Sequence, residues 1–183
     1  VMDVKPTILV SSNGNVYLIG EIYRLNKEVP KGQQPDNWPD EKSTITHYIQ
    51  GMMVVNFNAR GSVEWQTSLA INQAPVNDEG ASISFITGMV RDKVAFIYND
   101  HPANANISDP NKKESMVKPD TKNSSTFIAY VDKYGKLDAD VLWYNKEDEG
   151  IILPYSAFRL NRTQVLALAH SPKGTYRVVK LTF

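Results

Sequence analysis

Hydrophobic and polar residues alternate along much of this 183-residue chain, and such alternation predicts β-strands. Around Gly20, for example, Val16, Leu18 and Ile22 occupy every second position, which is the period of side chains along a strand. Four shorter runs are apolar at odd and even positions alike: MMVVNF, VAFIY, FIAYV and VLALA. Such runs are typical of strands covered on both faces by other sheets. No window has convincing helical spacing after a capping residue, so the pattern predicts an all-β protein.

Two predicted hairpins resemble each other: VVNFNARGSVEW around Gly61 and AYVDKYGKLDADVLW around Gly135. Each has an apolar strand, an Asn or Asp, a Gly, and then a strand that carries Trp65 or Trp143. Glycine suits such a short turn because the turn needs a residue at positive φ, where a side chain costs about 1 kcal/mol. We therefore predict that both glycines are structural and that both tryptophans pack between neighbouring units.

Alignment of the turns predicts repeated units of antiparallel strands. Expected strands lie near residues 5–11, 15–24, 47–58 and 62–70, then near 82–90, 93–100, 124–132 and 136–145, and finally near 151–159, 163–170 and 174–183. Tandem four-stranded meanders are the signature of a β-propeller, whereas a β-sandwich explains the strands but not the recurring turns. The expected fold is therefore an all-β, partial β-propeller over residues 1–183, with blades at about 5–70, 82–145 and 151–183.

Two full blades and a three-stranded third blade cannot close a ring, because propellers typically have at least four blades. We expect the chain to be the C-terminal part of a larger propeller. Its partners would be the remaining blades, on the same polypeptide or on a separate chain. Without those blades, the flat faces of the first and third blades would be exposed and prone to association.

Two long connections, Leu25–Thr46 and His101–Asn123, fall between the second and third strands of the first two units. Loops of such length are uncommon and tend to be functional or disordered. Equivalent connections of successive blades emerge on one rim, so these loops are expected to be neighbours and to carry any specific surface. The first loop contains Trp38, which would either stack on a sugar or anchor a partner, or fold back to pin its own loop.

The second loop begins with a polar cluster formed by Asn99, Asp100, His101 and Asn104. Such oxygen-rich side chains are able to hold Ca²⁺ or to hydrogen-bond a sugar or a protein partner. The alternative, which we favour, is that Asn99 and Asp100 satisfy backbone groups at the end of a strand. His101 would then be extended simply because Pro102 follows it.

Composition excludes several classes of function. Twenty basic and twenty acidic residues balance, so no broad positive field favours nucleic acid. The chain has no cysteine, which excludes disulfides and thiolate chemistry. It begins without a signal-peptide pattern, and no apolar run approaches the roughly 20 residues that span a bilayer. No membrane insertion is therefore expected.

Catalytic and cofactor motifs are also lacking, so no catalytic residue, metal ligand or cofactor is predicted. The sequence contains no HExxH, GxSxG, phosphate loop or dinucleotide fingerprint, and its three histidines lie in different units. Acidic residues do cluster in two connections, and paired acids can hydrolyse glycosides. We interpret both clusters as solvated turns: Glu147, Asp148 and Glu149, and Asp36, Asp40 and Glu41.

The order GNVYLIGEIY, MMVVNFNARGSVEWQ, SFITGMVRDKVAFIYNDHPAN, TFIAYVDKYGKLDADVLWYN and TYRVVKLTF resembles a family of poorly characterised envelope or secreted proteins of Bacteroidota-type bacteria. The resemblance covers most of the chain outside the two long loops. It implies a propeller-like C-terminal region and a location in the cell envelope, at the periplasm or outer surface, or outside the cell. It supplies no catalytic residues.

Two functions follow as hypotheses. The first is a non-enzymatic interaction or scaffold module of an envelope or secreted protein, which binds a protein or glycan through Trp38 and the Asn99–Asn104 cluster on one rim. The second is a carbohydrate-binding or glycan-active propeller with a central-channel site that further blades complete. Enzyme activity is left open, and the lack of catalytic motifs favours the first hypothesis.

Overall fold

The computed structural model describes residues 6–28, 43–78, 80–107, 112–116, 123–144, 150–161, 163–171 and 173–183. Within them the chain forms three antiparallel sheets of four, four and three strands. The prediction of an all-β protein is therefore confirmed. Among the described residues the sheets do not join into a closed ring, so the assignment to a propeller stays a prediction.

The strands follow the predicted order, with each four-stranded sheet a simple meander. The first sheet contains β1 (Thr7–Val10), β2 (Val16–Glu28), β3 (Thr44–Phe57) and β4 (Val63–Gln73). The second contains β5 (Phe85–Val90), β6 (Lys93–Asp100), β7 (Ser125–Val131) and β8 (Leu137–Tyr144), with a short 3-10 helix η1 (Pro102–Asn106) after β6. The third contains β9 (Ile151–Arg159), β10 (Gln164–His170) and β11 (Tyr176–Thr182).

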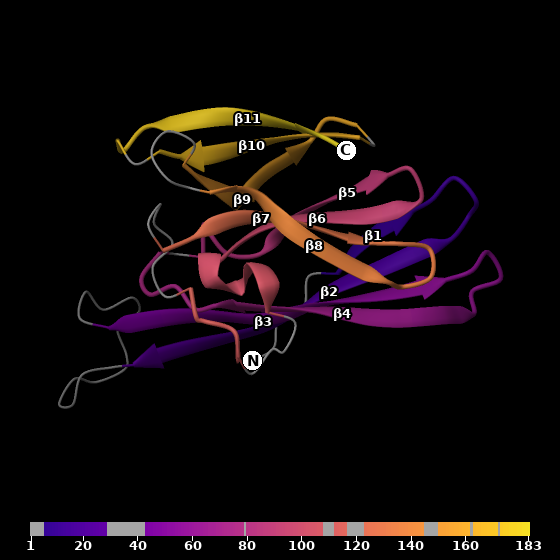
Figure 1. The fold of residues 1–183 in the computed structure, drawn as a ribbon, viewed down its shortest axis with the longest axis horizontal. Helices are drawn as coiled ribbons and strands as arrows, with labels where there is room; N and C mark the ends of the chain where they lie inside the picture. The colour runs from indigo at the N-terminus through magenta and orange to yellow at the C-terminus, as the bar shows by residue number, and fades with distance from the viewer. Residues whose placement is uncertain are drawn as a thin grey trace.

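The second sheet lies between the other two (Figure 1). Side chains at Met89, Phe96 and Phe127 on one of its faces join the first sheet in a large hydrophobic cluster. Side chains at Ile86 and Ile97 on the other face join the third sheet in a smaller cluster. Both faces of the second sheet are thus covered, as its unbroken apolar runs predict.

The first and third sheets have only one covered face. In the first sheet Tyr17, Ile19 and Val54 are buried toward the second sheet. The opposite face is also apolar but exposed, at Ile8, Val10, Ile22, Met53 and Val63. The third sheet repeats this arrangement, with apolar side chains exposed at Phe158, Leu168, Tyr176 and Val178. Among the described residues no sheet covers these two faces, and the prediction that further blades cover them stays a prediction.

One turn geometry recurs in the described chain. In the β3–β4 turn the carbonyl of Asn58 accepts from Gly61 N (2.9 Å), and Gly61 has φ of +80°. In the β7–β8 turn the carbonyl of Asp132 accepts from Gly135 N (3.0 Å), and Gly135 also has φ of +80°. The structural role predicted for both glycines is therefore confirmed, since a side chain is strained in this conformation.

Both tryptophans pack between sheets, as predicted. Trp65 on β4 contacts Tyr17 and donates from Nε1 to the carbonyl of Lys133 in the second sheet at 2.8 Å. Trp143 on β8 packs against the cluster shared by the second and third sheets. Each indole thus joins two consecutive sheets.

Candidate functional site

Asn99, the first residue of the predicted polar cluster, is fully buried and connects the sheets. Its Nδ2 donates to the carbonyls of Ser82 (2.9 Å) and Ile152 (2.7 Å), and its Oδ1 accepts from the Thr126 hydroxyl. Its own carbonyl accepts from Gln73 Nε2 at 2.6 Å. Because Gln73, Asn99 and Ile152 belong to the first, second and third sheets respectively, these bonds fasten all three together.

Asp100 and Asn104 secure the loop that follows β6. Asp100 Oδ1 accepts from His101 N (2.8 Å) and from Asn104 Nδ2 (2.9 Å). Asn104 also bonds both backbone groups of Glu114, as donor to its carbonyl (2.9 Å) and acceptor from its amide (2.8 Å). The segment 112–116 is bonded in turn to β4, through Met116. These polar side chains thus attach the loop of the second sheet to the first sheet.

The Asp100 carboxyl is buried where the loop begins, at the end of β6. Its pKa is raised above the ordinary value of 3.8 because burial disfavours the charged form. Lys113, whose Nζ lies 3.7 Å from Asp100 Oδ2, and the hydrogen bonds to the carboxyl partly oppose this effect. Both side chains are almost wholly buried, so the pair lies inside the loop rather than on its surface.

These contacts match the strand-end interpretation of the cluster. Asn99, Asp100 and Asn104 are at most 3% exposed, and groups of the chain bond each of them, although among the described residues Asp100 Oδ2 has only Lys113 Nζ nearby, at 3.7 Å. His101 is partly exposed, and its Nδ1 accepts from Ala103 N at the start of η1. A ligand-binding role for the cluster stays a prediction. Trp38, with the acidic residues of its loop and Glu147–Glu149, lies outside the described residues.

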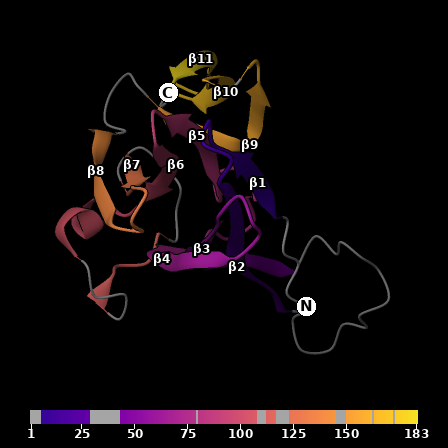
Figure 2. The same cartoon turned by 90° about the vertical axis from the view of Figure 1, so that its right-hand side faces the viewer.

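A second polar site lies where the first strands of the three sheets approach one another (Figure 2). A pocket of about 320 Å³ is lined there by Thr7 on β1, Phe85 on β5 and Tyr155 on β9. We call it the first-strand pocket. Glu21, Tyr23, His47 and Ser84 also line it. It therefore combines side chains from all three sheets.

Hydrogen bonds pair the polar side chains of the first-strand pocket. The Ser84 hydroxyl donates to Glu21 Oε1 across the junction of the first and second sheets. The Tyr23 hydroxyl and His47 Nδ1 lie 3.0 Å apart within the first sheet. The pocket thus presents a carboxylate, an imidazole, four hydroxyls and three aromatic rings, from the residues Thr7, Glu21, Tyr23, His47, Ser84, Phe85 and Tyr155.

Ser84 adopts a conformation that is rare outside glycine. Its φ is +75°, in the left-handed region. Two interactions hold it there: Ser84 N donates to Gln73 Oε1 at 3.0 Å, and its hydroxyl bonds Glu21. Gln73 is itself fixed to the Asn99 carbonyl. The buried network around Asn99 therefore positions a residue of the pocket.

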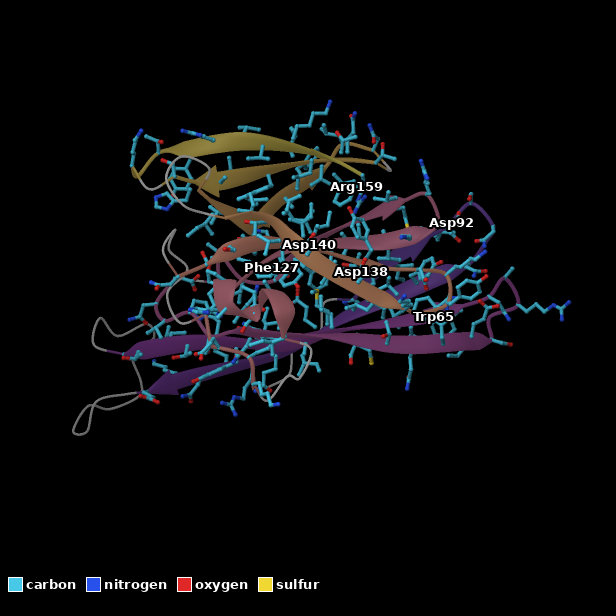
Figure 3. The ribbon with its side chains drawn as sticks, in the orientation of Figure 1. Trp65, Asp92, Phe127, Asp138, Asp140 and Arg159 are labelled. Atoms are coloured by element: carbon cyan, nitrogen blue, oxygen red, sulfur yellow. The ribbon has the colours of Figure 1, made fainter. Side chains whose placement is uncertain are left out.

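Another hollow of about 380 Å³ separates the first and second sheets. Its lining includes Leu69 and Ala70 on β4, Lys113, and Phe127 and Asp138 of the second sheet, the last two of which are labelled in Figure 3. Leu69 and Phe127 belong to the hydrophobic cluster between these two sheets. Unlike the first-strand pocket, this hollow is lined by no described residue of the third sheet.

Sequence reasoning missed the first-strand pocket. Glu21, Tyr23 and Ser84 carry no motif, and the one polar residue beside Tyr155, Ser156, marks no site in the sequence. The three histidines lie in different predicted units, which gives no sign that His47 belongs to a pocket. Among the described residues no group of three His, Cys, Asp or Glu side chains is arranged to hold a metal.

The residues that the structure describes contain no helix that is long and apolar enough to cross a bilayer. Comparison of the chain with protein-family models, with curated proteins and with solved structures found no match.

Proposed function

We propose that the chain is part of a β-propeller and acts as an interaction and scaffold module. Its sheets follow one another along the chain as antiparallel meanders, and their first strands line one pocket. That arrangement is typical of consecutive propeller blades around an axis. A bacterial cell-envelope or secreted protein is the setting that the sequence resemblance implies.

One observation carries this proposal: the outermost faces of the stack are apolar. Val10 is 56% exposed on the first sheet, and Phe158 and Val178 are 66% and 69% exposed on the third. Contiguous apolar side chains at a surface mark a site of association. Both ends of the stack are therefore suited to contact further protein.

The second sheet indicates what kind of partner these faces accept. Its two faces are covered by the first and third sheets through aliphatic and aromatic side chains. The outer faces carry the same residue types in the same alternation. We infer that each outer face packs against another antiparallel blade, carried either on the same polypeptide or on a separate chain.

The rim that carries the long loops is the second contact surface in this proposal. The C-terminal ends of β2 and β10 point toward the end of the molecule where η1 lies (Figure 1). The described C-terminal ends of these second strands thus lie on one side of the molecule. Trp38 and the partly exposed ring of His101 belong to the long loops. A protein or glycan bound on this rim is the partner proposed here.

Charge substitutions on the outer faces test the proposal. Val10→Lys and Val178→Lys place one ammonium on each outer face, where the native side chains are exposed and no core contact is lost. We expect the wild-type chain to self-associate with rising concentration in sedimentation velocity and to bind an apolar fluorescent dye. The double variant should sediment as a monomer and bind less dye, with an unchanged midpoint of thermal unfolding.

Tyr134→Lys is the matched control, because Tyr134 is 76% exposed on the β7–β8 turn and lies on neither outer face. It should behave as the wild type does. A monomeric wild-type chain that binds no dye would contradict the proposal, as would an equal effect of the control substitution.

A carbohydrate-binding or glycan-active propeller is the second candidate function. The observation that favours it is the first-strand pocket, since the central channel of a propeller runs beside the first strands of its blades. This candidate needs the pocket and not the outer faces, so the two functions are tested separately.

A further inference from the structure

We infer that the first-strand pocket binds a neutral sugar ring, with Tyr155 as the stacking platform and Glu21 and His47 as hydrogen-bonding groups. The inference rests on the second candidate function and gives it a site and a ligand class. It does not depend on the outer faces. A pocket in which a few polar groups converge beside aromatic rings is the usual form of a small-molecule site.

Tyr155 provides an aromatic surface that solvent reaches. It is 82% exposed and lines the pocket. The apolar face of a sugar ring, made of C–H groups, packs on such a ring, and burial of both surfaces favours the contact.

A β-bulge directs Tyr155 toward the pocket. The pairing of β9 with β10 shifts between Leu166 and Leu168. The hydroxyl of Ser156 stabilises the extra residues, since it donates to the carbonyl of Leu153 (2.6 Å) and accepts from Leu168 N (2.8 Å). Bulges commonly turn a side chain out of its regular alternation next to a binding site. The aromatic platform is thus built into the strand.

The imidazole of His47 lines the first-strand pocket, and one of its two nitrogens is used within the first sheet. Nδ1 pairs with the Tyr23 hydroxyl at 3.0 Å. Among the described residues no hydrogen bond involves Nε2. That nitrogen donates if the Tyr23 hydroxyl donates to Nδ1 and accepts in the opposite tautomer. In either state it can bond one hydroxyl of a sugar.

Glu21 supplies a carboxylate acceptor to the first-strand pocket. Its carboxylate bonds the Ser84 hydroxyl, and an ionised carboxylate accepts about four hydrogen bonds in all. Carboxylates bonded to hydroxyls give strong, charge-assisted hydrogen bonds. Glu21 and the His47–Tyr23 pair therefore offer both acceptors and a donor, the combination that a polyhydroxylated ring requires.

Other ligand classes fit the pocket less well. An anionic ligand would meet the Glu21 carboxylate, and the described residues hold no three-ligand cluster for a metal. An alkylammonium would suit the carboxylate and the aromatic rings but would make no use of the imidazole or the hydroxyls. A neutral sugar uses all of these groups.

Affinity electrophoresis of the full chain tests the inference. Native gels containing a neutral β-glucan, mannan, xylan or galactan are compared with a gel without polysaccharide. We expect at least one polysaccharide to retard the wild-type chain. Calorimetric titration with an oligosaccharide cut from that polysaccharide then gives the affinity. Tyr155→Ala and Glu21→Gln should each weaken it by about tenfold or more, equivalent to about 1.4 kcal/mol.

Tyr176→Ala is the matched control. Tyr176 is also an exposed tyrosine of the third sheet, 65% exposed, but does not line the pocket. Its removal should leave the affinity unchanged, and circular dichroism should show that all variants keep their sheet content. Equal losses for Tyr155→Ala and Tyr176→Ala would overturn the inference. The inference would also be overturned if no polysaccharide retarded the chain. It would likewise be overturned if the chain bound a trimethyllysine peptide, which carries an alkylammonium group, and no polysaccharide. None of these results would alter the test of the outer faces.

Discussion

The indole of Trp65 in the first sheet lies directly against Gly135 in the β7–β8 turn of the second sheet. A Cβ added to Gly135 would lie 2.9 Å from Trp65 Cδ2, closer than carbon atoms normally approach. The carbonyl of Lys133, in the same turn, accepts the indole N–H. Figure 3 shows Trp65 on the right-hand side of the molecule, where this turn lies. One glycine thus permits both the turn and the contact between sheets.

Gly135→Ala should destabilise the protein more than Gly61→Ala does. Both glycines have φ of +80°, so either substitution costs about 1 kcal/mol for backbone strain. Only position 135 adds a steric conflict, which typically costs a further 1–3 kcal/mol or so in a packed site. Urea unfolding gives both free energies. Equal losses would show that the indole moves aside at no cost.

Gly88→Ala should loosen the contact between the second and third sheets. A Cβ at Gly88 would lie 2.3 Å from two atoms of the Phe183 ring, so the ring has to move. Phe183 packs against the cluster that joins these sheets. We expect a loss of about 1–3 kcal/mol in the free energy of unfolding. In a Phe183→Ala background the same substitution should cost much less, because the ring is no longer there. A double-mutant cycle in which the two substitutions have additive effects would show that Gly88 and Phe183 do not interact as described.

Asn99→Asp should destabilise the fold although it preserves the shape of the side chain. It removes the donor shared by the carbonyls of Ser82 and Ile152, in a site where Asn99 is fully buried. A buried acceptor without a partner costs about 1–3 kcal/mol. Thermal unfolding should therefore shift to markedly lower temperature. An unchanged midpoint would mean that the hydrogen bonds from Asn99 to the neighbouring backbone contribute little to the stability of the fold.

Asp100→Asn should change how stability depends on pH. Burial raises the pKa of Asp100 in the folded state above the ordinary 3.8. The folded protein then holds this proton more tightly than the unfolded chain, so stability falls as pH rises from about 4 through the folded pKa. The free energy of unfolding of the wild type minus that of the variant should therefore decrease over this range. A difference that is constant with pH would contradict the shift.

Asp132→Asn provides a control, because its effect on stability should change with pH in the direction opposite to that of Asp100→Asn. The amides of Tyr134 and Lys136 bond its carboxylate, and the first of these bonds is the main reason that its pKa is lowered. Its contribution is present above the ordinary carboxyl pKa and is lost as pH falls through the lowered value. The wild-type advantage over this variant should thus increase with pH. Chemical denaturation between acidic and neutral pH measures both variants in one series.

Much of the fold followed from local patterns. The strands at Lys93–Asp100 and Ile151–Arg159 have the predicted bounds, because alternation and apolar runs depend on neighbouring residues alone. The positive φ of Gly61 and Gly135 followed from turn chemistry. The cluster at Asn99 was found for the same reason, since polar residues at a strand end are visible in the sequence.

The first-strand pocket was not predictable in this way. Glu21 lies in the first sheet and Tyr155 in the third, whereas Ser84 directly precedes the second, and none of them belongs to a motif. Their convergence depends on how the sheets stack. The direction of Tyr155 depends further on a bulge whose stabilising bonds come from Ser156. A sequence pattern records neither of these relations.

The sequence by itself determined which segments form strands, where the chain turns and which faces are apolar, because these properties arise from side-chain alternation and from the conformational limits of single residues. Only the tertiary structure decided which apolar faces are covered. The faces of the second sheet are buried, whereas Val10 and Val178 are exposed although their strands are as apolar as those at the centre. Burial requires a partner surface in space, and local residue order does not specify one.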